Sequence, residues 1–171
     1  MALRTLMDGR LKVTILTTDP TADPLDGSAI PVATLTGGID ATCDLAKAGT
    51  RFSATASDTI ADARLCDEAN TNALGASNYE AAMAVFWLLD EDGAYDPQDN
   101  PTFEAIREKG STVWVVLREG PSAKTDWASG DAYELWEFVS DNPQRPTETS
   151  GYLKRIVPGQ GQKLLDGVVA A

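Results

Sequence analysis

The sequence predicts a mainly β protein with a β-sandwich or barrel-like fold and one short flanking α-helix. Short runs of alternating or β-branched residues, separated by Gly, Pro, Asp and Asn, are typical of such folds. Only one segment has the pattern of a helix. Domains usually contain roughly 100–200 residues, so residues 1–171 are expected to form a single domain.

The N-terminal part is predicted to be extended. Residues 10–18 alternate well enough for a first strand, and residues 1–30 together are interpreted as an N-terminal strand followed by a loop rich in Pro and Asp. Residues 32–43 are expected to continue as an extended run. The pair Gly37-Gly38 indicates a bend or bulge within it.

A hairpin of small residues is predicted at residues 51–67. Residues 51–57 alternate between a small polar and a small apolar face, and residues 60–66 are expected to be the antiparallel return strand. Residues 70–76 are expected to be a loop. Because the hairpin has no bulky residue to anchor it in a large core, it is suited to lie against a neighbour. A modest edge hairpin is the alternative.

The middle of the chain is predicted to hold the longest strand and the helix. Residues 79–89 are apolar on both faces, as a central sandwich strand is, although an Ala-rich run also suits a helix. The helix is predicted over residues 100–110. Asn100 can serve as its N-cap, Pro101 occupies its first turn, and Gly110 ends it.

The C-terminal part is predicted to be entirely β. Residues 112–119 and 132–139 are the strongest strand candidates, because they are dense in β-branched and aromatic residues. Residues 151–158 and 163–170 are expected to form a terminal strand pair. Residues 159–161, Gly-Gln-Gly, would be the turn between them.

The composition argues against several classes of function. The chain contains no histidine, which removes Ser-His-Asp and Cys-His nucleophile pairs and zinc sites built on imidazole. The 14 Lys and Arg residues against 26 Asp and Glu give a net charge of −12, which argues against tight nucleic-acid binding. The longest apolar run, residues 81–89, is far shorter than the roughly 20 residues of a membrane span. No membrane insertion is therefore expected.

Several weaker patterns are candidates for functional sites. The acidic residues 89–104 do not fit an EF-hand in either register and are expected to be a solvated turn. No spacing singles out a carboxylate pair for glycoside hydrolysis, and residues 159–161 lack the third glycine of a phosphate loop. Cys43 and Cys66 are expected to be buried thiols, with a disulfide between them as the less favoured alternative. Core packing is expected for the four tryptophans, with a stacking platform as the alternative: Trp87, Trp114, Trp127 and Trp136. No catalytic, cofactor-binding or metal-ligating residue is expected.

A series of structural residues carries a further signal through its order and spacing over about residues 35–171. The series comprises Leu65-Cys66, Asn70, Gly75, Ser77-Asn78-Tyr79-Glu80, Met83, Val85-Phe86, Leu88, Asp90, Asp92-Gly93, Phe103, Lys109-Gly110, Val113-Trp114-Val115-Val116, Arg118, Ala128, Gly130-Asp131, Gly151-Tyr152, Lys154 and Val157-Pro158. It resembles the major tail tube proteins of long-tailed, siphovirus-type bacteriophages, especially those that infect actinobacteria.

This resemblance implies a structural virion protein without enzymatic activity or cofactor. In that family, β-sandwich subunits form hexameric rings that stack into a hollow tube around a tape-measure protein, and DNA later passes through without specific binding. The resemblance also implies tail terminator and distal tail proteins as partners, a place in the virion tail and assembly in the host cytoplasm. A tail completion, connector or minor tail protein is the alternative in the same class. A ligand-binding β-sandwich is the alternative outside it.

The resemblance also implies where the functional residues lie. A hairpin from each subunit contributes to an inner barrel in that family, and residues 51–67 are expected to take this place. The candidates for facing the lumen are Arg51, Ser53, Thr55, Ser57, Asp58, Asp62 and Arg64. The candidates for contacts between stacked rings are Arg4, Arg10, Asp23, Asp40, Asp44 and Lys47.

Overall fold

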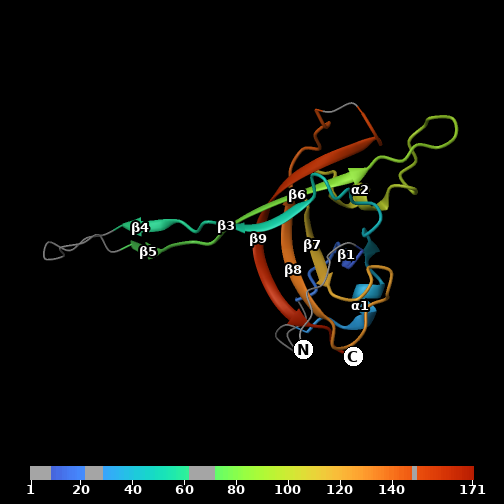
Figure 1. The fold of residues 1–171 in the computed structure, drawn as a ribbon. Coiled ribbons are helices and arrows are strands. Elements are labelled where there is room, and N and C mark those ends of the chain that lie inside the picture. Colours follow the sequence, from blue (N-terminus) through green and yellow to red (C-terminus); the bar gives the residue numbers. More distant parts are fainter. Residues whose placement is uncertain (1–8, 22–28, 62–71, 148–149) are drawn as a thin grey trace, which may run out of the picture.

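The computed structural model describes residues 9–21, 29–61, 72–147 and 150–171. These residues form a mainly β structure, which confirms the predicted fold class. Seven strands build one curved antiparallel sheet in the order β2-β1-β7-β8-β9-β6-β3, and β4 and β5 form a separate two-stranded ribbon (Figure 1). The strands are β1 (Leu11–Leu16), β2 (Ile39–Asp40), β3 (Arg51–Thr55), β4 (Thr59–Ala61), β5 (Asn72–Leu74), β6 (Asn78–Phe86), β7 (Thr112–Glu119), β8 (Ala132–Ser140) and β9 (Lys154–Val168). The helices are α1 (Val32–Thr36) and α2 (Pro101–Ile106).

The expectation of a single helix was wrong, because the run predicted as extended over residues 32–43 begins with α1. Leu35 of α1 is buried against the sheet, and this tertiary contact outweighs the strand preference of the β-branched residues around it. The chain then passes so close to β1 that a Cβ on Gly38 would lie 2.6 Å from Leu16 and 2.7 Å from Thr14. Strand β2 follows and pairs with β1.

The predicted pairing of the hairpin was also wrong. Strand β3 pairs with β6, from Arg51 opposite Ala82 to Thr55 opposite Asn78, and residues 60 and 61 of the expected return strand belong to β4. Strand β4 pairs with β5, which lies in the segment expected to be a loop. The alternation of small residues identified strands but could not select their partners, because many registers satisfy the same pattern. The part of the predicted hairpin beyond residue 61 lies outside the described residues.

The C-terminal pair of strands is one continuous strand, β9. Residues 159–161, expected to form a turn, lie inside this strand, and neighbouring side chains occupy the space beside both glycines. A Cβ on Gly159 would lie 2.3 Å from the Phe138 ring, and one on Gly161 would lie 2.7 Å from Tyr79. The glycines therefore allow close packing. Strand β9 pairs with β6 over residues 154–160 and with β8 over residues 159–168.

The core lies on both faces of the sheet, as the alternation along the central strands dictates. In β7, Val113, Val115 and Leu117 belong to one cluster of buried residues, whereas Val116 belongs to the other. Helix α2 covers the first face with buried Phe103 and Ile106. Helix α1 and the loop that carries Trp127 cover the second face. All four tryptophans pack in or against these clusters, in agreement with the core interpretation.

Helix α2 begins where predicted, but it ends four residues before the predicted boundary. Gly110 N–H bonds to the carbonyl of Ser140 at 2.8 Å, so the chain turns here to meet β8. Asn100 does not cap the helix with its side chain. Its amide instead accepts a hydrogen bond from the backbone of Leu88 at 2.9 Å and donates to the carbonyls of Leu88 and Asp96. This buried amide therefore fixes the chain between β6 and α2.

Candidate functional site

The lumen candidates on β3 share one face of the sheet. Arg51, Ser53 and Thr55 alternate with Phe52, whose ring packs toward the core at 6.0 Å from Trp136. Phe52 thus anchors β3 to the core from the opposite face, a role that the prediction of a hairpin without a bulky anchor missed. Ser57 and Asp58 follow in the link to β4. The two remaining lumen candidates, Asp62 and Arg64, lie outside the described residues.

The same polar face continues from β3 onto β6 and β9. Glu80 is opposite both Ser53 and Gln160 in the register of the sheet. Arg51 and Glu80 form an exposed ion pair at 3.2 Å. Because positive and negative side chains are paired here, the face carries no concentration of the chain's negative charge. Neither core cluster includes Ser53, Glu80 or Gln160.

Two of the candidates for ring contacts, Arg10 and Asp40, form contacts within the chain. Arg10 donates to the carbonyl of Gly120 at 2.7 Å. Asp40 pairs with the buried Lys12 at 2.8 Å. Burial raises the pKa of Asp40, but hydrogen bonds from Lys12 and Thr42 outweigh it and hold the pKa below its usual value.

Two further ring-contact candidates belong to the loop of residues 40–50. Asp44 accepts a hydrogen bond from the hydroxyl of Thr102 at 2.5 Å, which ties this loop to α2. Lys47 is exposed. The remaining candidates, Arg4 and Asp23, lie outside the described residues.

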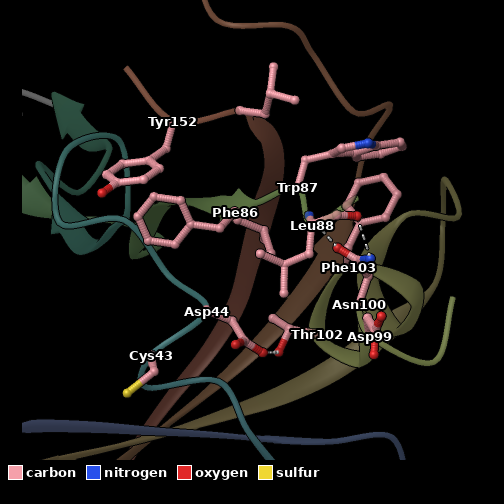
Figure 2. A pocket seen from close by; sticks show the side chains of 12 residues that line it. Cys43, Asp44, Phe86, Trp87, Leu88, Asp99, Asn100, Thr102, Phe103 and Tyr152 are labelled. Carbon is pink, nitrogen blue, oxygen red and sulfur yellow. Dashed lines mark hydrogen bonds between the residues drawn. The ribbon is translucent and has the colours of Figure 1, made fainter. Parts of the chain in front are cut away.

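An apolar groove of about 390 Å³ lies beside α2, where β6 ends and β9 begins (Figure 2). Tyr152, Leu153 and Leu88 are 84%, 56% and 48% exposed at this groove. Its lining is Cys43, Asp44, Val85, Phe86, Trp87, Leu88, Asp99, Asn100, Thr102, Phe103, Tyr152 and Leu153. This groove was not predicted from the sequence. The available signal was the pair Tyr152-Leu153, two large apolar residues in an otherwise polar connection.

Stacked side chains support one wall of the groove. Trp87 lies on Tyr95 with ring centroids 4.4 Å apart, and the guanidinium of Arg155 lies 4.2 Å from the Trp87 ring. Tyr95 donates its hydroxyl to Glu104 at 2.5 Å. Burial, and then the neighbouring Glu104 carboxylate, raise the pKa of Tyr95 to about 12.

The acidic segment that follows β6 is an exposed turn, as predicted. The Asp90 carboxylate accepts the backbone N–H groups of Asp92 at 3.0 Å and Ala94 at 2.7 Å, so it organises its own loop. In the described ranges, no group of three or more Cys, Asp or Glu side chains is placed to hold a metal ion. Cys43 is exposed, contrary to the expectation of a buried thiol, and Cys66 lies outside the described residues. No helix in the described residues has the length and apolar character needed to cross a membrane.

Comparison with known proteins gives one family. The family model described as "Phage tail tube protein" matches residues 1–171. No curated protein matches the chain.

Proposed function

The chain belongs to the phage tail tube protein family, and from this premise we propose that its copies form hexameric rings that stack into the hollow tail tube of a siphovirus-type phage. As a member of this family it is a structural component of the virion tail and not an enzyme. The observation that carries the proposal is the family match over all 171 residues. We propose further that the chain acts as a single domain, that it assembles in the cytoplasm of an actinobacterial host, and that DNA passes through the tube during ejection.

The edges of the sheet support closure into a ring. The outer strands β2 and β3 each have one side without a strand partner among the described residues. Unpaired strand edges invite pairing with another chain, and closing several sheets into one barrel removes them. Copies joined side by side through these edges would therefore satisfy backbone groups that the isolated chain leaves to water.

The polar face of β3, β6 and β9 is suited to line the lumen of such a barrel. We assign to it Ser53, Thr55 and their neighbour Arg51, with Ser57 and Asp58 in the link to β4. Asp62 and Arg64, which lie outside the described residues, are proposed as further lumen-facing residues. The paired charges of Arg51 and Glu80 leave no strong positive field to retain phosphate groups. This balance suits a conduit that must release DNA. The tape-measure protein is proposed to fill the lumen before ejection, and tail terminator and distal tail proteins to close the two ends.

Electron microscopy of the purified protein tests this function. Negative staining should show rings or tubes of uniform width, and native mass spectrometry of the rings should give six copies. A monomer that stays dispersed at high concentration, even with the tape-measure protein and its chaperones, would contradict the proposal. Rings of another size would contradict only the hexamer.

A further inference from the structure

The β4–β5 ribbon presents an exposed leucine to solvent. Leu74 is 81% exposed. In the part of the chain that the structure describes, β4 and β5 pair only with each other, and the ribbon projects well away from the seven-stranded sheet (Figure 1). An isolated two-stranded hairpin is at best marginally stable in water. The ribbon therefore gains stability if another surface packs against it.

Hydrogen bonds at the base of the ribbon fix its direction. The backbones of Asp58 and Ala76 are joined by an N–H···O bond of 3.1 Å, and Gly75 N–H bonds to the Asp58 carbonyl at 2.6 Å. The Asn78 amide donates to the carbonyl of Ala56 at 3.1 Å and to the Asp58 carboxylate at 3.0 Å. Leu74 is thus held at a defined position relative to the sheet. Its small neighbours Gly75 and Ala76 allow the backbone here to approach another surface closely.

The groove beside α2 is a concave apolar surface on the same chain. Its walls are held in place, because Asn100 ties down Leu88 and the ring of Phe86 meets Tyr152 edge to face at 5.9 Å (Figure 2). Removing a buried leucine side chain leaves a cavity of about 150 Å³. The groove, at about 390 Å³, has room for a leucine together with adjoining backbone.

We propose that the ribbon of one copy inserts Leu74 into the groove of the next copy. The inference rests on the proposed function, since a tail tube protein assembles with itself. The ribbon and the groove are different surfaces of one chain, so the contact is heterologous. Such a contact repeats from copy to copy, and it forms a closed ring where the rotation closes and an open filament where it does not. The loop of residues 40–50, expected to make contacts between rings, borders this groove through Cys43 and Asp44.

Cys43 offers a direct test, because it is exposed at the edge of the groove. The chain would carry Leu74→Cys with Cys66→Ser, and the assembled protein would be treated with a short bismaleimide. A covalent ladder of dimers, trimers and longer species is expected, since each copy then holds both reactive positions. Peptide mass spectrometry should find the linkage between position 43 and position 74. If the Leu74→Cys variant does not assemble, an Ala76→Cys variant retains Leu74 and places the thiol two residues further along the chain.

Matched variants separate this contact from general crosslinking. Adding Cys43→Ser should abolish the ladder. Lys124→Cys in place of Leu74→Cys, which moves the thiol to the exposed loop between β7 and β8, should give much less of it. Leu74→Asp should reduce the yield of tubes by more than about tenfold, because a charge would enter an apolar groove, whereas Ser77→Asp should leave the yield unchanged. Tubes that form without any 43–74 linkage, or that form normally with Leu74→Asp, would overturn this inference and leave the proposed function standing. Absence of rings and tubes from the unmodified chain would overturn both.

Discussion

At the scale of single residues, Arg118 is a buried charged side chain that requires several polar partners. Its side chain is 1% exposed and pairs with Asp131 at 2.7 Å. It also donates to three backbone carbonyls of the loop between β7 and β8, and lies 5.0 Å from the Trp127 ring. One arginine thus organises the loop that covers the second face of the sheet.

Arg118→Ala is expected to lower the free energy of unfolding by about 3–5 kcal/mol. The cause is that the half-buried Asp131 carboxylate loses its ion-pair partner and three backbone carbonyls lose their hydrogen-bond donor. Chemical denaturation of the unassembled protein measures the effect. Lys109→Ala is the control, since its pair with Asp141 is exposed and 3.5 Å long, and should cost less than about 1 kcal/mol. Equal stability of the two variants would contradict this role of Arg118.

Tyr95 gives a prediction that depends on pH. Its pKa in the folded chain, about 12, is above the ordinary value of 10.0, so folding favours the protonated phenol. The resulting stability is fully present below about pH 10 and is lost as the pH rises through about 12. Tyrosinate absorbance of the wild type minus that of Tyr95→Phe should show a transition near pH 12. Tyr95→Phe should also lose less stability than the wild type between pH 10 and 12. A difference transition near pH 10 would contradict this account.

At the scale of single elements, β9 depends on glycines for its fit against β8. Gly159→Ala is expected to destabilise the fold by about 1–3 kcal/mol or more, since its Cβ would overlap the Phe138 ring and approach the Val139 carbonyl to 2.6 Å. Thermal unfolding measures this. Gln160→Ala, at the exposed position between the two glycines, should change stability by less than about 0.5 kcal/mol. Phe138→Leu should cost less in the Gly159→Ala background than alone, because it relieves the overlap.

The polar face of β3 gives a prediction about DNA passage. Ser53→Lys together with Thr55→Lys should slow or block DNA ejection while tubes still assemble, because added positive charges would hold phosphates. The measurement is infectivity and the rate of DNA release from phage that carry the substitutions. Gln at the same two positions is the control, since it adds similar length without charge. Normal infectivity of the lysine variant would contradict the assignment of this face to the lumen.

At the scale of the whole molecule, assembly must bring together copies that each carry a net charge of −12. Electrostatic repulsion between copies extends about 30 Å at 0.01 M salt but only about 8 Å at 0.15 M. The fraction of protein sedimenting as rings or tubes should therefore rise with salt over this range. A fraction that falls with salt would show that attractive ion pairs between copies outweigh their net repulsion.

The sequence by itself determined the fold class, several elements and the character of one face. Residues 112–119 are β7 as predicted, because this run is dense in β-branched and aromatic residues, which fit the pleated surface of a sheet. The alternation of Ser53 and Thr55 with Phe52 likewise predicted a polar face, since successive side chains of a strand point to opposite sides.

Only the tertiary structure decided how these elements pair. Residues 51–57 and 60–66 could satisfy the same alternation as partners, but the packing of Phe52 against Trp136 and Phe138 accompanies pairing of β3 with β6. The Gly-Gln-Gly run fits a turn locally. In the fold it lies within β9, because Phe138 and Tyr79 occupy the space that side chains at positions 159 and 161 would fill. The groove was beyond prediction for the same reason: it joins residues from β6, α2 and the segment before β9, and local sequence patterns carry no information on contacts between distant segments.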